Sequence, residues 1–81
     1  MPKTVGTAPQ KRLAELLVEA RHKAGLTQVE LAKKLKIKQQ QVSHLESGQR
    51  RIDLIELVEI LKAMGLEPRQ TISKIVKDLG E

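Results

Sequence analysis

The sequence predicts an all-α protein, a small five-helix bundle that contains one pair of short, closely spaced helices. Three observations lead to this fold class. Apolar residues recur three and four positions apart, helix-start and helix-stop signals alternate, and no segment shows the two-residue alternation of a strand. With 81 residues, 40% of them hydrophobic, the chain is expected to form one domain with a thin core.

Start and stop signals set the bounds of the expected helices. These helices span residues 9–24, 28–35, 39–47, 54–64 and 69–79. The start signals are Pro9, Thr27, Asp53 and Pro68. Thr27 and Asp53 are each followed three positions later by a glutamate, a spacing that predicts two capping boxes. The stop signals are Gly25, Gly48, Gly65 and Gly80. Two of these glycines precede a leucine, which predicts Schellman endings.

Each long helix carries an apolar stripe, and two short helices lie between them. The stripe of the first helix consists of Leu13, Leu16, Leu17, Ala20 and Ala24. The stripe of the fourth consists of Leu54, Leu57, Val58, Leu61 and Met64, and that of the last of Ile72, Ile75, Val76 and Leu79. Residues 28–35 and 39–47 form a short helix, a tight turn and a second short helix with a polar face, which is the helix-turn-helix plan.

The composition excludes several kinds of function. There are no aromatic residues, so no base can stack on a protein ring, as happens in many RNA-binding and single-strand-binding domains. The sequence lacks cysteine, a phosphate-binding glycine loop and a histidine–carboxylate cluster. We therefore expect no enzyme, no cofactor and no metal. Without a signal peptide or a membrane-length apolar run, we expect a cytoplasmic protein.

The positive charge of the chain is concentrated in one segment. Residues 33–51 contain a single acidic residue, Glu46, and their net charge equals the +5 of the whole chain. The basic residues of this segment are Lys33, Lys34, Lys36, Lys38, Arg50 and Arg51. A charge run is often only a solvated face, but charge this segregated favours a polyanionic partner such as nucleic acid.

The segment GLTQVELAKKLKIKQQQVSHLESGQRR resembles the helix-turn-helix domain of the Cro/cI repressor (XRE) family. The resemblance rests on Gly-Leu-Thr-Gln-x-x-Leu-Ala followed by Val-Ser-x-x-Glu-x-Gly, and it covers residues 13–66. The following RRIDLIELVEILKAMGL is similar to the family's fourth helix. The resemblance implies a lambda repressor-like fold whose second short helix enters the major groove of DNA.

Two lysines depart from the family pattern. Lys36 stands where the family usually has a turn glycine, and a lysine enters the left-handed region at a higher energy than glycine. Lys38 stands where Ser, Thr or Pro often begins the recognition helix. It cannot cap the helix with an oxygen, and its charge opposes the positive end of the helix dipole. Both lysines add a cation beside the expected DNA-binding helix.

The polar face of the helix over residues 39–47 supplies the candidate base contacts. On a helical wheel its two apolar residues define a narrow buried edge, and Gln40 and His44 lie on the opposite side. A glutamine amide pairs a donor with an acceptor, as adenine N6 and N7 require. The resemblance implies base contacts at Gln39, Gln40 and His44, while Gln41 can reach a base or a phosphate. Glutamines are ordinarily solvated helix residues, but this motif favours base readout.

The expected phosphate contacts surround this face. They are Gln28, Lys38, Ser43, Gln49, Arg50 and Arg51. The resemblance implies this role for Gln28, which stands where free helix amides attract anions, whereas Ser43 is equally well a plain surface serine. The basic residues contribute affinity and salt dependence rather than sequence reading. The resemblance also implies a structural ion pair between Arg21 and Glu46.

These observations predict a sequence-specific regulator, a repressor of phage or bacterial type, that binds double-stranded DNA as a homodimer. We expect a flexible N-terminus over residues 1–8, a DNA-binding domain over 9–66 and an additional helix within 67–81. That helix either forms the dimer contact or closes the monomer's own core.

One alternative function is that of an antitoxin, which binds a toxin protein and represses its own operon, although residues after Gly65 do not resemble a toxin-wrapping tail. Another is an adaptor that uses the fold without DNA.

Overall fold

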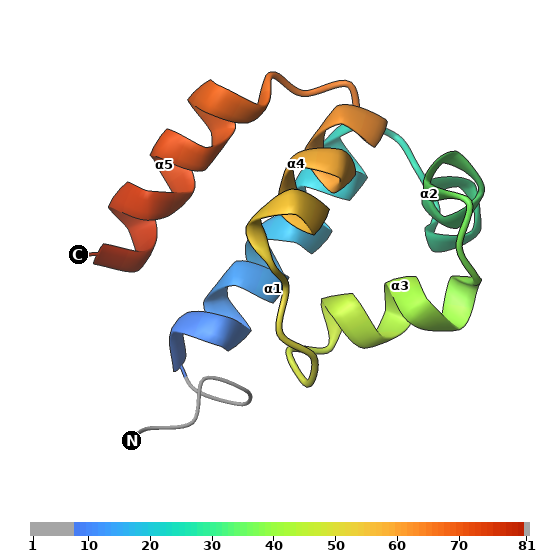
Figure 1. Cartoon of the computed structure of the whole chain (residues 1–81), viewed down its shortest axis with the longest axis horizontal. Helices are drawn as coiled ribbons and strands as arrows, with labels where there is room; N and C mark the ends of the chain where they lie inside the picture. The colour runs from blue at the N-terminus through green and yellow to red at the C-terminus, as the bar shows by residue number, and fades with distance from the viewer. Residues whose placement is uncertain (1–7, 81) are drawn as a thin grey trace.

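The computed structural model describes residues 8–80, and within them the chain forms five helices (Figure 1). They are α1 (Ala8–Lys23), α2 (Gln28–Leu35), α3 (Gln39–Glu46), α4 (Leu54–Ala63) and α5 (Pro68–Gly80). The all-α fold class is confirmed, and each helix begins and ends within one residue of its expected bounds. The flexible N-terminus expected over residues 1–8 lies outside the described residues, apart from Ala8, which begins α1.

Both predicted capping boxes are present, at the starts of α2 and α4. The Thr27 hydroxyl accepts a hydrogen bond from the Glu30 N–H at 3.0 Å, and the Glu30 carboxylate accepts one from the Thr27 N–H at 2.9 Å. The hydrogen bond from the Thr27 backbone has the largest effect on the Glu30 carboxyl and lowers its pKa below the ordinary value. The hydrogen bond with the Thr27 side chain lowers this pKa further. Asp53 and Glu56 form the same reciprocal pair, with distances of 2.7 and 3.4 Å.

A residue in the left-handed backbone conformation follows each of the first four helices. Gly25, Gly48 and Gly65 have φ angles of +74°, +78° and +78°, whereas Gly80 is the last residue of α5 itself. After α1 and α4, the leucine that follows the glycine donates its N–H back to a helix carbonyl, which completes the two predicted Schellman endings. Lys36 ends α2 at φ +60° and ψ +41°, the conformation expected from its place in the turn.

The helices enclose a single apolar core, in which each short helix is anchored by a long one. α2 and α3 pack against each other, α3 also packs on α1, and α2 on α4. The buried core consists of Leu17, Leu31, Ala32, Val42, Leu45, Leu57, Ile60, Leu61, Met64 and Ile75. Figure 1 shows α2 and α3 together on one side of the molecule and α5 on the other. No helix within residues 8–80 combines the length and apolar character needed to cross a bilayer.

The last helix contributes to this core and is tied to the first. α5 packs against α1 and α4, and its Ile75 is 7% exposed. The Arg12 guanidinium donates to both carboxylate oxygens of Asp78, at 2.9 and 3.0 Å, and this partner lowers the pKa of Asp78. Val76, the neighbour of Ile75 in the sequence, is 62% exposed. α5 therefore closes the core and leaves one apolar residue of its stripe exposed to solvent.

We predict that Lys36→Gly raises the free energy of unfolding by about 0.5–1 kcal/mol. Glycine removes the Cβ strain of the left-handed conformation, and the greater entropy of the unfolded chain offsets part of this gain. Urea denaturation followed by circular dichroism measures the change. Lys34→Gly, on the exposed face of α2, is the matched control and should instead lower stability by about 1 kcal/mol. A loss of stability in Lys36→Gly would contradict the strain at this turn.

Candidate nucleic-acid interface

α3 is anchored by two apolar residues and presents most of its polar side chains to solvent. Val42 is fully buried and Leu45 is 4% exposed. The exposed side chains of the helix include the four expected base contacts, Gln39, Gln40, Gln41 and His44. Ser43 lies between them and is half-buried. The structure therefore gathers the candidate base-reading residues on one exposed helix whose packing uses only a narrow edge.

The start of α3 is capped by Gln41 rather than by Lys38. Lys38 has an extended backbone and its side chain makes no capping hydrogen bond. The side-chain oxygen of Gln41 accepts a hydrogen bond from the Lys38 N–H at 2.9 Å, which is the return half of a capping box. The lysine ammonium can only donate, so the other half is not formed. The sequence interpretation missed this role of Gln41, although a glutamine three positions after the cap is its known signal.

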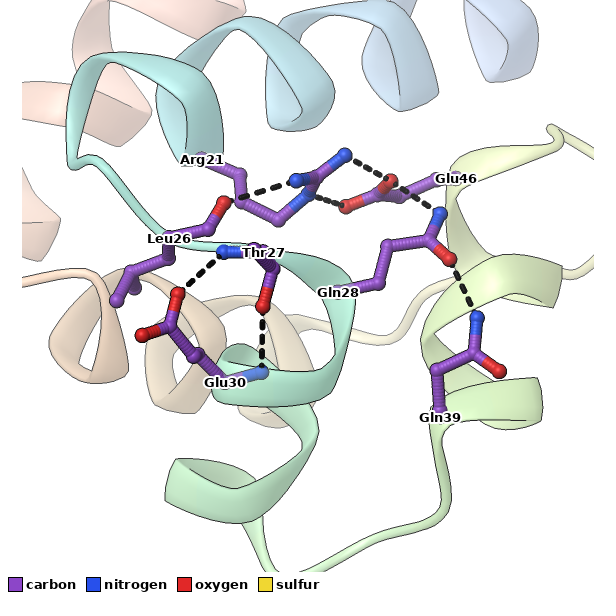
Figure 2. A network of polar contacts seen from close by, with 7 residues as sticks. All are labelled: Arg21, Leu26, Thr27, Gln28, Glu30, Gln39 and Glu46. Atoms are coloured by element: carbon purple, nitrogen blue, oxygen red, sulfur yellow. Dashed lines mark hydrogen bonds and ion pairs between the residues drawn. The ribbon is translucent and has the colours of Figure 1, made fainter.

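Arg21 and Glu46 form a buried ion pair that joins α1 to the end of α3 (Figure 2). Arg21 Nε lies 2.6 Å from Glu46 Oε2, and Nη2 lies 3.0 Å from Oε1, so the guanidinium donates two parallel hydrogen bonds. Nη1 donates a third to the Leu26 carbonyl oxygen at 2.9 Å. The two side chains are only 9% and 6% exposed. The last turn of α3 is thereby fixed against α1 and against the loop before α2.

The Glu46 carboxylate also orients two glutamines (Figure 2). Gln28 Nε2 donates to Glu46 Oε1 at 2.9 Å, and Gln39 Nε2 donates to Gln28 Oε1 at 2.6 Å. Because an ionised carboxylate can only accept, Gln28 turns its NH2 group toward Glu46, and its oxygen is left to accept from Gln39. The Gln39 amide is therefore held in one orientation. Its oxygen, which points away from Gln28 in Figure 2, and its second N–H remain available to a partner.

The loop between α3 and α4 carries the remaining expected contacts. Gln49, Arg50 and Arg51 are all exposed. Arg50 Nη2 lies 2.6 Å from Glu56 Oε2, so its charge is partly compensated within the chain. The Arg50 carbonyl accepts a hydrogen bond from the side chain of Gln10 at 2.7 Å. Arg51, in contrast, forms no ion pair with any described residue.

Most basic side chains of the segment lack an ion-pair partner among the described residues. Its exposed basic side chains are Lys33, Lys34, Lys36, Lys38, Arg50 and Arg51. Within residues 8–80, Arg50 is the only one of them in an ion pair. The same part of the chain holds no group of three or more metal-ligating side chains. Hydrogen-bonding amides surrounded by unpaired cations are a chemistry suited to a phosphate polymer.

We predict that Glu46→Ala lowers the free energy of unfolding by about 3–5 kcal/mol, because it leaves the Arg21 guanidinium buried without a counter-charge. The double variant Arg21→Met with Glu46→Leu replaces both charges by apolar side chains and should be clearly more stable than Glu46→Ala. Urea denaturation of the three proteins tests both expectations. If the free energy of unfolding of Glu46→Ala lies within about 1 kcal/mol of that of the unmodified protein, the ion pair contributes little to stability.

Comparison with known proteins agrees with this geometry. A family model described as helix-turn-helix matches residues 17–70. Among solved structures, an XRE-family like protein from Pseudomonas syringae pv. tomato is 40% identical, and the match covers 86% of this chain and 85% of that chain with a TM-score of 0.79. No curated protein matches the chain.

Two restriction-modification controller proteins are also similar. C.AhdI from Aeromonas hydrophila is 29% identical over 80% of this chain and 98% of that chain, with a TM-score of 0.72. Wild-type C.Esp1396I is 19% identical over 90% of this chain and 95% of that chain; its TM-score of 0.79 reflects a shared fold alone. The family match and the 40% identical relative show that the chain belongs to the XRE (Cro/cI-type) family of helix-turn-helix DNA-binding domains.

Proposed function

We propose that this protein is a sequence-specific transcriptional regulator, a repressor, that binds double-stranded DNA with α3 in the major groove. The observation that carries the proposal is the exposed polar face of α3, where the Gln39 amide is held in one orientation beside a strongly basic segment. The similarity to an XRE-family like protein and to the controller protein C.AhdI supports a regulatory role.

Base reading is assigned to the amides and the imidazole of α3. Gln39 keeps an acceptor oxygen and one donor N–H for a partner, the combination that pairs with adenine N7 and N6. Gln40 is exposed and carries the same two groups without a partner among the described residues. His44 is the third base contact and Gln41 the fourth, although the Gln41 oxygen is already engaged at the start of α3. Each good bidentate pair gives about 1–3 kcal/mol of discrimination between bases.

Phosphate binding is assigned to the groups around this face. They are Gln28, Lys38, Ser43, Gln49, Arg50 and Arg51. Gln28 can offer only one further N–H to a phosphate, because its other amide groups are bonded to Glu46 and Gln39. Lys38 and Arg51 are the strongest candidates, since both are exposed and neither has an acidic partner among the described residues.

We further propose a homodimer, because one recognition helix reads only a few base pairs and such proteins bind paired half-sites about one helical turn apart. Large apolar side chains are exposed on three helices, of which α2 contributes only Val29, at 51%. Leu54 and Ile55, which open α4, are 66% and 73% exposed, and Val76 on α5 is 62% exposed. We favour the start of α4, because it directly follows the basic loop and would bring the two loops close to the dimer axis.

Enrichment of bound sequences from random double-stranded DNA tests the main proposal. We expect a palindromic site with half-sites about one helical turn apart, and affinity that falls steeply with salt, by a slope of roughly 0.9 per neutralised phosphate. Gln40→Ala should lose discrimination at one base pair of each half-site. Binding that neither depends on salt nor prefers the enriched site over random DNA would overturn the proposal.

We predict that Lys38→Ser stabilises the free protein by about 0.5–1 kcal/mol while weakening its binding to DNA. Serine supplies the missing half of the cap and removes a cation from the positive end of α3, but the same cation is lost from the DNA-facing surface. Thermal denaturation and fluorescence anisotropy measure the two effects. Lys77→Ser on α5 is the control for charge removal. Unchanged DNA affinity in Lys38→Ser would leave Lys38 without a role in binding.

We predict that Ile55→Glu makes the protein monomeric without unfolding it, because Ile55 is exposed and an acidic residue is favourable in the first turn of a helix. Sedimentation equilibrium gives the oligomeric state, and binding to a complete palindrome should weaken more than binding to a single half-site. Val76→Glu places the same charge on α5 and should leave the dimer intact. A dimeric Ile55→Glu together with a monomeric Val76→Glu would assign the contact to α5 instead.

A further inference from the structure

Gln10 is a buried polar side chain that the site described above does not explain. It lies in the first turn of α1 and is 9% exposed, whereas the other buried polar groups of the described chain considered above, Arg21 and Glu46, pair with each other. Its Nε2 donates a hydrogen bond of 2.7 Å to the carbonyl oxygen of Arg50, 40 positions away. A buried amide directed at one main-chain carbonyl fixes the position of that carbonyl, since leaving either group unpaired is unfavourable.

The carbonyl that Gln10 holds belongs to a loop with few other internal bonds. The Gln49 N–H donates to the Ser47 hydroxyl at 3.4 Å, and among the hydrogen bonds of residues 8–80 none has the N–H of Arg50 or Arg51 as its donor. The loop instead rests on α1 at two points. One is the Gln10 bond, and the other is Gly48, where an added Cβ would lie 3.4 Å from the main chain of Lys11.

The bond from Gln10 also determines the direction of the next main-chain donor. In a planar trans peptide the carbonyl of one residue and the N–H of the next point in opposite directions, and no peptide bond of the described chain is cis. The Arg50 carbonyl points inward, to a buried side chain of α1. The Arg51 N–H therefore points away from α1. The side chain of Arg51 is also exposed.

We infer that Gln10 is a positioning residue for phosphate binding: it holds the peptide between Arg50 and Arg51 so that the Arg51 N–H and guanidinium can bind one phosphate group of DNA. The inference rests on the proposed function and deepens it. Main-chain N–H groups commonly bind DNA phosphates and set the register of a protein on the duplex. The Arg50 guanidinium is turned toward Glu56, which leaves Arg51 as the donor side chain at this end of the loop.

The test compares Gln10→Met with Gln70→Met in the full-length protein. Methionine nearly matches glutamine in size but cannot donate to the Arg50 carbonyl. Gln70, an exposed residue of α5, takes the same substitution as a control. Gln10→Met should bind the enriched site and random DNA roughly tenfold more weakly, with a salt slope shallower by about one and an unchanged base preference. Gln70→Met should bind like the unmodified protein.

A second measurement needs no variant. In the unmodified protein, the Arg51 amide proton should shift downfield in NMR spectra when DNA is added, as expected for a new hydrogen bond to a phosphate. An unmoved Arg51 amide overturns the inference even if Gln10→Met does not fold. A folded Gln10→Met with unchanged affinity and salt slope overturns it while leaving the proposed function intact. An unmodified protein that does not bind DNA overturns the proposed function and this inference together.

Discussion

The proposed DNA-binding surface depends on the buried ion pair between Arg21 and Glu46. α3 has only Val42 and Leu45 with which to pack, so an additional anchor holds its last turn against α1. A buried pair stabilises a fold only when its hydrogen-bonding groups are satisfied. Here the guanidinium makes a bidentate contact and a further bond to a carbonyl, and the carboxylate accepts a third bond from Gln28. Because the same carboxylate orients the glutamines, the structural role of the pair and the presentation of the binding surface cannot be separated.

The turn between α2 and α3 contains a locally unfavourable residue at each of its ends. Lys36 occupies a left-handed conformation that glycine adopts more easily, and Lys38 begins α3 without a side-chain cap. Neighbouring contacts compensate in part, through the capping box of α2 and the bond from Lys38 N–H to Gln41. In the free protein the cation of Lys38 at the positive end of α3 is unfavourable, whereas that of Lys36 lies at the negative end of α2. A phosphate placed there reverses the sign of this interaction, so the turn suits a bound polyanion better than the free chain.

The five helices were predictable because their signals are local. A capping box joins residues three positions apart, a Schellman ending joins residues five positions apart, and an apolar stripe indicates which face of a helix is buried. The partner of Arg21 was expected from the family resemblance, since the charges alone do not specify a pairing. The contact between Gln39 and Gln28 spans 11 positions and that between Gln10 and Arg50 spans 40. Such contacts depend on how the helices pack, and periodicity carries no information about them.

α1 has no expected contact with DNA, yet it positions two different parts of the proposed binding surface. Near its end, Arg21 holds the carboxylate that orients the amide of Gln39, which is assigned to a base. In its first turn, Gln10 holds the loop assigned to a phosphate. Eleven residues of helix separate these anchors by roughly 16 Å, so each acts on one end of the surface. If α3 and the loop bind DNA as proposed, base reading and phosphate binding are supported from opposite ends of α1, and substitutions at Arg21 and at Gln10 should affect them separately.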